Sequence, residues 1–162
     1  MWLQVDETPT RLPHVGEVRV SELSQGSQIF IWSIRQWVVS RRSLRCVGCD
    51  LASTYGRLGC KPAIAHLDQF MKRIVFAPLR PLELRHPQFP TLSQDERTML
   101  RVPQAVNNPT DRRSARSAAA QLVSDGSEDL VEFALRYVAA LARSGLTLND
   151  YRHLRLTWSR SA

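Results

Sequence analysis

The chain has 162 residues, of which 43% are apolar, and this length fits one domain with a core of its own. Its formal net charge is +7, and all of its 22 basic residues except Lys61 and Lys72 are arginines. The longest apolar stretch, from Ile29 to Val39, contains polar residues and is far shorter than the roughly 20 residues that a membrane span needs. The composition therefore predicts an independently folding domain without a transmembrane helix or a membrane partner.

The cellular compartment is predicted from the N-terminus and from the cysteines. The first nine residues lack the basic region, apolar run and cleavage site of a secretory signal peptide. Three cysteines within one short window are an odd number, unlike the disulfide framework of a secreted domain. Arginine-rich, lysine-poor usage is typical of a GC-rich genome. We expect a bacterial protein of the reducing cytoplasm.

The chain begins with a segment of low core character. Residues 1–25 contain Pro9, Pro13 and Gly16 among polar positions, followed by the alternating pattern of Val18 and Val20. This composition predicts an N-terminal tail or edge segment.

A central helix is predicted from Ser27 or Gln28 to Arg42. Its apolar residues include Ile31, Ile34 and Val38, which recur at helical spacing. The many β-branched residues would also suit a strand, but the stretch is too long and does not alternate. Two tryptophans in the same segment favour burial over most of the helix surface.

Two further helices are predicted next. The first starts near Cys49 or Asp50 and ends at Gly59, and the second starts at Lys61–Pro62, where proline loses no hydrogen bond. The second, residues 61–76, has the clearest amphipathic pattern of the chain.

An extended, proline-rich segment follows. Residues 78–90 contain four prolines, which exclude a helix and place Leu82 and Leu84 on one face. Ser93 and Glu96 then form a capping box that starts another helix, and we expect Pro103 to end or kink it.

The C-terminal third is predicted to contain an antiparallel pair of helices. An alanine-rich helix follows Asn108–Pro109, and a long helix capped by Ser127 ends before Gly145. Residues 146–162 are a C-terminal extension whose expected anchors are listed here: Leu148, Leu154, Leu156 and Trp158. The predicted fold is all-α, a compact bundle of about five or six helices over residues 26–145 with one extended proline-rich segment.

The cysteines give the sharpest local pattern. Cys46, Cys49, Cys60 and His66 provide the ligand types and the number that tetrahedral zinc requires. Zinc is an alternative only, and we expect no cofactor, because Cys60 and His66 would have to fold back from a separate helix. Small thiols that fill gaps between helices are the simpler interpretation.

A redox function is the other interpretation of these cysteines. A thiol at a helix N-terminus is favoured as the thiolate, and Arg41, Arg42 and Arg45 precede Cys46. The βαβ pattern that surrounds a thioredoxin-like motif is missing from the sequence.

Nucleic-acid binding is a second alternative function. Arg41, Arg42 and Arg45 form one basic cluster, and a second cluster is formed by Arg112, Arg113 and Arg116. Both clusters lie near predicted helix ends, where the helix dipole or simple solvation explains them about equally well. No helix-turn-helix pattern accompanies them.

The preferred function is protein binding without catalysis. The sequence has no Gly-x-Ser-x-Gly, no phosphate-binding glycine loop and no His-Glu-x-x-His. We expect a regulatory or adaptor protein that binds another protein or a second copy of itself, with Trp37 among its anchors. The predicted binding residues lie on the proline-rich segment: Arg80, Arg85, His86 and Phe89.

Four stretches resemble a known group of proteins. They are residues 32–38, residues 52–62, residues 80–84 and the helix start at residues 93–96. In this order they are similar to small uncharacterised helical proteins of alphaproteobacteria, over about residues 27–145. The resemblance implies a helical fold and a bacterial source, and it implies no activity. Members carry a cysteine-rich stretch where this chain has residues 85–90.

Overall fold

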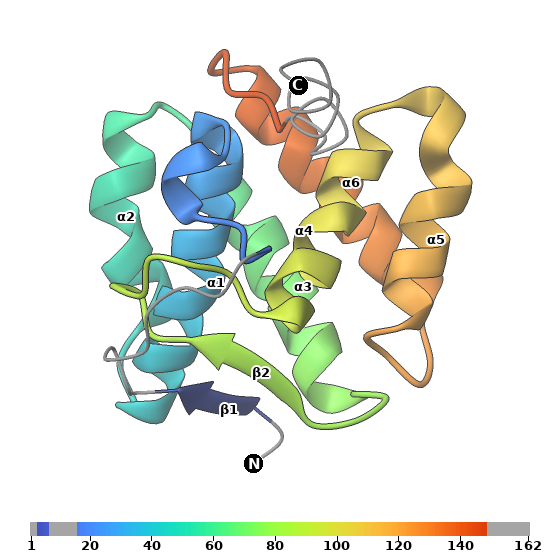
Figure 1. The fold of residues 1–162 in the computed structure, drawn as a ribbon. Helices are drawn as coiled ribbons and strands as arrows, with labels where there is room; N and C mark the ends of the chain where they lie inside the picture. Colours follow the sequence, from blue (N-terminus) through green and yellow to red (C-terminus); the bar gives the residue numbers. More distant parts are fainter. Residues whose placement is uncertain (1–2, 7–15, 149–162) are drawn as a thin grey trace, which may run out of the picture.

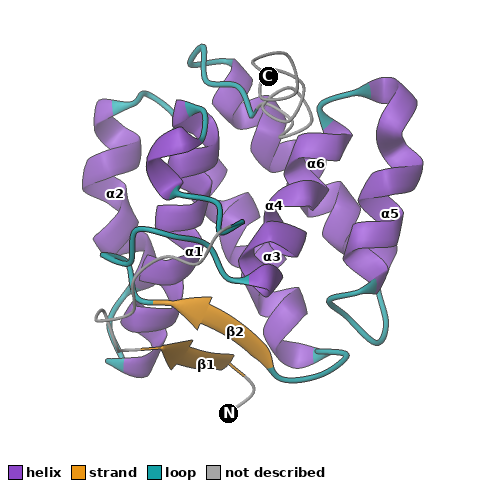
Figure 2. Ribbon diagram, in the orientation of Figure 1, coloured by secondary structure: helices purple, strands orange, loops and turns teal. Residues whose placement is uncertain are grey.

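The computed structural model describes residues 3–6 and 16–148, which fold into a mostly helical bundle (Figures 1 and 2). Its helices are α1 (Gln25–Arg42), α2 (Val47–Arg57), α3 (Ala63–Phe76), α4 (Gln94–Val106), α5 (Arg112–Ala120) and α6 (Ser127–Ala142). Short 3-10 turns occupy Val20–Glu22 and Pro109–Asp111, and the strands are β1 (Leu3–Asp6) and β2 (Leu82–Arg85). The predicted all-α bundle with one extended segment is confirmed. Within the described residues, no helix combines the length and the apolar character needed to cross a membrane.

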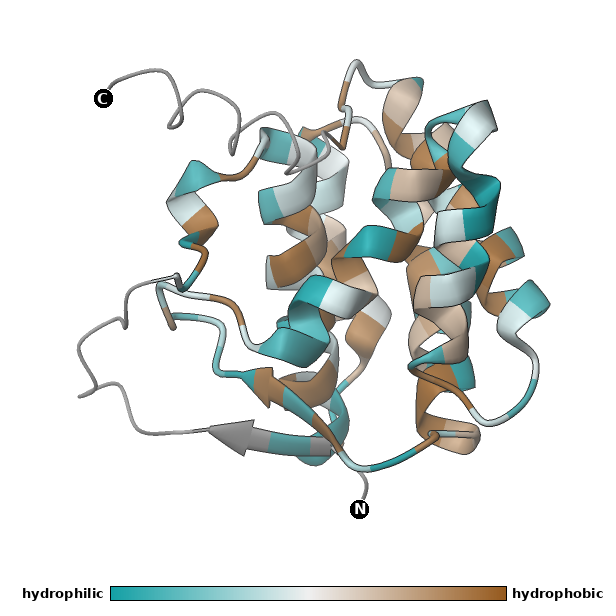
Figure 3. Ribbon diagram, turned by 45° about the vertical axis from the view of Figure 1, so that its right-hand side comes forward, coloured by the Kyte–Doolittle hydropathy of each residue, from teal (hydrophilic) through white to brown (hydrophobic). Residues whose placement is uncertain are grey.

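The core lies between α1, α3, α4 and α6. The α6 helix packs mainly against α3, and also contacts α4 and α5. The ring of Phe30 in α1 meets Phe70 and Tyr137 edge-on, with centroid distances of 5.7 and 5.6 Å. Figure 3 shows both hydrophilic and hydrophobic residues along the helices, as expected for helices that each bury one side. The prediction that α1 is central and buried over most of its surface is confirmed.

Helix starts follow local capping chemistry. At α4, the Ser93 side chain accepts from the Glu96 amide and the Glu96 carboxylate accepts from the Ser93 amide, which confirms the capping box. The α2 helix starts at Val47, slightly earlier than predicted, because Cys46 caps it. The predicted cap at Ser127 is wrong, since Gly126, with a φ of 70°, holds the N-cap position.

Pro103 lies inside α4 and does not end it. The helix continues to Val106, so the prediction that Pro103 ends it is wrong. A proline inside a helix loses one backbone hydrogen bond and crowds the preceding turn. Here Val102, Ala105 and Val106 are all buried in the core, and their packing offsets that cost.

The proline-rich segment contributes one strand, β2, to the two-stranded sheet of the described fold. The β1 and β2 strands pair in parallel, from Leu3 opposite Leu82 to Asp6 opposite Arg85. Leu82 and Leu84 are buried and Glu83 is exposed, which confirms the predicted face. In Figure 1 the two strands lie across the lower front of the bundle. We call residues 78–92 the arm.

The segment that follows α6 packs against the start of α1. Leu23, Leu146 and Leu148 are buried. A Cβ atom at Gly26 would lie 2.4 Å from the carbonyl oxygen of Thr147, so only glycine allows this approach. The other predicted C-terminal anchors, Leu154, Leu156 and Trp158, lie outside the described residues, as do residues 7–15 of the N-terminal segment.

Candidate functional site

A buried arginine fixes the arm to the bundle. Arg35, from the middle of α1, is 1% exposed and forms a two-point ion pair with Glu96 of α4, at 2.7 and 2.8 Å. Its remaining N–H groups donate to three carbonyl oxygens of the arm: Phe89 at 2.7 Å, Thr91 at 2.7 Å and His86 at 3.4 Å. All five guanidinium donors are therefore used.

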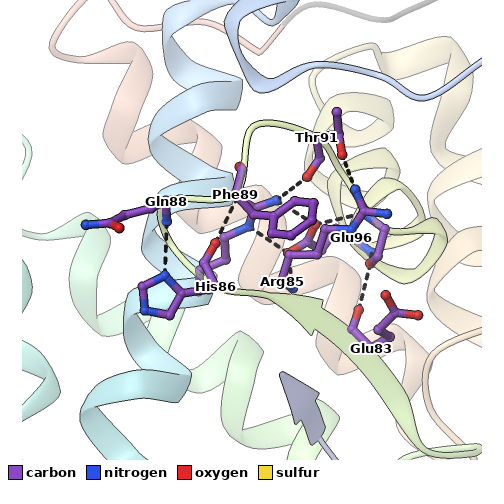
Figure 4. A network of polar contacts seen from close by, with 9 residues as sticks. Glu83, Arg85, His86, Gln88, Phe89, Thr91 and Glu96 are labelled. Atoms are coloured by element: carbon purple, nitrogen blue, oxygen red, sulfur yellow. Dashed lines mark hydrogen bonds and ion pairs between the residues drawn. The ribbon is translucent and has the colours of Figure 1, made fainter. Parts of the chain in front are cut away.

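Both carboxylate oxygens of Glu96 also have further hydrogen-bond donors. Beyond Arg35, its two oxygens accept the backbone N–H groups of Arg85 and Ser93, both at 2.9 Å. Figure 4 shows Glu96 beside Arg85, Phe89 and Thr91 of the arm. A buried charge is tolerated only when it is paired and hydrogen-bonded in this way. No pattern in the sequence indicates this pairing, because the partners of Arg35 lie more than 50 residues away along the chain.

The arm side chains predicted to bind a partner are largely engaged within the chain. Arg85 pairs with Glu17 at 3.1 Å and also donates to the Thr91 hydroxyl. Its guanidinium lies 4.7 Å from the ring centroid of Phe89, which is 9% exposed. Arg80 pairs with Asp95 at 2.5 Å, and this interaction raises the pKa of Arg80. These contacts hold the arm against the bundle.

His86 and Gln88 lie at the bend of the arm. The Nδ1 atom of His86 accepts the backbone N–H of Gln88 at 3.4 Å, and the Gln88 side chain is exposed (Figure 4). Trp37, the other predicted anchor, is 2% exposed and donates to Asp68 at 2.9 Å, so its use as an exposed anchor is wrong. Its position on the face of α1 that meets α3 explains its burial.

The α1–α2 turn, residues 41–49, presents a different kind of surface. Leu44 is 95% exposed, and its φ of 54° places a non-glycine residue in the left-handed region. It ends α1 in a Schellman arrangement, in which Arg45 N–H donates to the Ser40 carbonyl and Leu44 N–H to that of Arg41. Glycine or asparagine is usual at this position, so sequence patterns did not predict the conformation.

The two exposed cysteines of this turn are in contact. The Cys46 sulfur accepts the backbone N–H of Cys49 at 3.3 Å at the N-terminus of α2. Two hydrogen bonds with Cys49 lower the pKa of Cys46: the larger effect comes from the Cys49 thiol, and the smaller from the Cys49 backbone N–H. The same interaction with Cys46 raises the pKa of Cys49. Within the pair, Cys46 is therefore the thiol that ionises first.

The structure does not assemble the four predicted zinc ligands. Cys60 is buried, and burial raises the pKa of its thiol. Burial is the largest cause that lowers the pKa of His66. The nearby cations Arg136, in α6, and Arg143, directly after α6, lower it further. Across residues 3–6 and 16–148, no three His, Cys, Asp or Glu side chains group as metal ligands would. Zinc binding stays an untested alternative.

The two arginine clusters lie on different sides of the bundle. Figure 1 shows α1 and α5 well separated, so the clusters do not form one continuous basic surface. Arg45 pairs with Asp50 at 2.5 Å, which lowers the pKa of that carboxyl, and Arg41 stacks over Trp37 at 5.3 Å. Arg112 and Arg113 are exposed, whereas Arg116 pairs with Glu128 at 2.9 Å. Nucleic-acid binding would have to use one cluster at a time.

A chain of hydroxyl groups crosses the core. The Tyr55 hydroxyl lies 2.8 Å from the Ser33 oxygen and 2.9 Å from the hydroxyl of Tyr137, and all three residues are buried. Desolvation raises the pKa of Tyr55 to about 12 and that of Tyr137 well above its ordinary value. Because all three residues are buried and their hydroxyl groups bond to one another, we assign them to the specificity of core packing.

Comparison with known proteins adds no relative to this description. No family model, no curated protein and no solved structure matches the chain significantly. The resemblance to small alphaproteobacterial proteins therefore stays a prediction. The class that fold and site define is a small helical bundle with a braced arm and an exposed, cysteine-containing turn.

Proposed function

We propose that this chain is a non-enzymatic regulatory or adaptor protein of the cytoplasm that binds another protein through the α1–α2 turn. The observation that carries the proposal is Leu44, which is 95% exposed in a left-handed conformation. This conformation costs a non-glycine residue about 1 kcal/mol or more. A large apolar side chain at this position therefore contributes nothing to the fold, and contact with a partner explains its presence.

The surroundings of Leu44 define the chemistry of the partner. Arg41 and Arg42 are exposed beside it at the end of α1, and the whole chain carries a net charge of +7. Like charges would oppose the docking of two such turns against each other. The partner is thus an acidic protein surface with an apolar pocket, and the arm supports the bundle that presents the turn.

Site-specific photo-crosslinking in the cells that make the protein tests the proposal. A photoreactive amino acid at Leu44 should give one discrete adduct with an acidic protein, and the same group at exposed Ser53 of α2 should not. Arg41→Glu with Arg42→Glu should remove the adduct. Equal labelling at both positions, or an adduct with nucleic acid or a second copy of this chain, would contradict the proposal.

The variant Leu44→Gly separates binding from folding. Glycine adopts a positive φ without strain, so the variant should be as stable as the parent chain or up to about 1 kcal/mol more stable in urea denaturation. It should bind the crosslinked partner more weakly in titration calorimetry. Unchanged affinity would show that the leucine side chain is not the anchor.

A further inference from the structure

We infer that Cys46 and Cys49 form a thiol–disulfide exchange pair, in which Cys46 is the attacking thiol and Cys49 resolves the mixed disulfide. The inference rests on the contact between the Cys46 sulfur and the Cys49 backbone N–H and on the exposure of both cysteines, and it is independent of the proposed partner surface. Both cysteines are exposed, whereas Cys60 is buried. A small disulfide from solution can therefore reach the pair but not the third thiol.

The local geometry brings the two sulfurs together. Cys46 has extended backbone angles, φ −71° and ψ 108°, and its sulfur folds back onto the first turn of α2, 3.3 Å from the Cys49 amide. The carbonyl of Cys46 accepts from Asp50, so residues 46–50 form one closed turn. Cysteines three residues apart at a helix start are neighbours, which an internal disulfide requires.

The hydrogen bond within the pair assigns different roles to its members. The pKa of Cys46 is lowered, by Cys49 above all, and that of Cys49 is raised. Asp50 opposes ionisation of both thiols, and its carboxylate is paired with Arg45. The thiolate is the reactive species in disulfide exchange, so Cys46 attacks first.

The oxidant is a low-molecular-weight disulfide such as oxidised glutathione. The Cys46 thiolate attacks one of its sulfurs, a new S–S bond forms, and one glutathione thiolate leaves. Cys49 then gives its proton to the leaving group and attacks the Cys46 sulfur, which releases the second glutathione. The two cysteines lose two electrons and two protons, and the glutathione disulfide gains them.

Mass spectrometry of the purified full chain with oxidised glutathione tests these roles. The parent chain should end with an internal Cys46–Cys49 disulfide, and Cys49→Ser should stop at one glutathione on Cys46. Cys46→Ser, in which serine also caps a helix well, should react more slowly than Cys49→Ser. Accumulation of glutathionylated parent chain without an internal disulfide would overturn the inference.

A reference thiol isolates the effect of the turn. Ser53→Cys, in a chain that also carries Cys46→Ser and Cys49→Ser, places one exposed thiol in the middle of α2. Alkylation of Cys46 in the parent chain, followed at this residue by peptide mass spectrometry, should reach half its maximal rate at a lower pH than alkylation of this reference. Coincident pH profiles, or equal glutathione rates for Cys46→Ser and Cys49→Ser, would refute the assignment of Cys46 as nucleophile.

Discussion

The guanidinium of Arg35 performs a task that an apolar side chain could not. It compensates the carboxylate of Glu96 and supplies N–H donors to three carbonyls of a segment that cannot pair them in a helix. Residues 78–90 of that segment contain four prolines, which have no backbone N–H to donate. One long, planar, permanently charged side chain thus replaces the missing hydrogen-bond partners.

Loss of Arg35 should therefore be severe. Arg35→Met leaves Glu96 buried without a counter-ion and removes the donors from the arm, so we expect a loss of about 3–5 kcal/mol in urea denaturation. The matched control is Arg116→Ala, whose exposed pair with Glu128 should contribute less than about 1 kcal/mol. Similar losses in the two variants would contradict the central role assigned to the buried pair.

Sequence patterns predicted some residues of the site and not others. The position of Cys46 and Cys49 near a helix start was predicted, because spacing in sequence fixes neighbours within one turn. Leu44 was not singled out, because a left-handed leucine has no signature in the sequence. Arg35 was not predicted either, since its partners Phe89, Thr91 and Glu96 come together only in the folded chain.

At the scale of elements, α1 is tied to the C-terminal segment by a single glycine. Replacing glycine by alanine inside a helix usually stabilises it by roughly 0.5–1 kcal/mol. A Cβ at Gly26 would lie 2.4 Å from the Thr147 oxygen, a backbone atom that can yield only if the segment moves.

Gly26→Ala should consequently destabilise the protein by about 1–3 kcal/mol, as overpacking does. Gly48→Ala, where a Cβ meets nothing within 4 Å, is the matched control and should leave stability unchanged or slightly increased. Thermal or urea unfolding of both variants measures the difference. A stabilised Gly26→Ala chain would show that residues 146–148 do not pack against α1 in solution.

The helices themselves were largely predictable from periodicity and caps. The amphipathic pattern identified α1 and α3, and the Ser93 box identified the start of α4. Pro103 misled the prediction, because burial of its neighbours outweighs the local preference of proline. The parallel pairing of β1 with β2 was missed, since nothing in a four-residue segment indicates a partner far along the chain.

For the whole molecule, the buried tyrosines predict a loss of stability in alkali. Below about pH 10 the phenols are neutral in both the folded and the unfolded chain, and their full contribution is present. Between about pH 10 and the Tyr55 pKa of about 12, the Tyr55 hydroxyl loses its proton in the unfolded chain and keeps it in the folded chain. The free energy of unfolding should fall by up to about 2–3 kcal/mol over this window through Tyr55, and Tyr137, whose pKa is also raised, should change it in the same direction.

Urea denaturation at a series of alkaline pH values measures this slope. The variant Tyr151→Phe leaves only Tyr55 and Tyr137 to titrate, so near-ultraviolet absorbance reports their ionisation directly. Phenolate that appears in the folded variant near pH 10 would contradict the burial of the pair.

The Arg35 contacts also determine how the molecule opens. If the arm separated by itself, a charged group would remain in the interior, facing Glu96 but deprived of three of its acceptors. Such a partial opening is costly, so the arm, α1 and α4 should behave as one cooperative foldon. In native-state hydrogen exchange, the amides of residues 82–85 should then exchange only through openings close in free energy to global unfolding, although the arm lies at the surface.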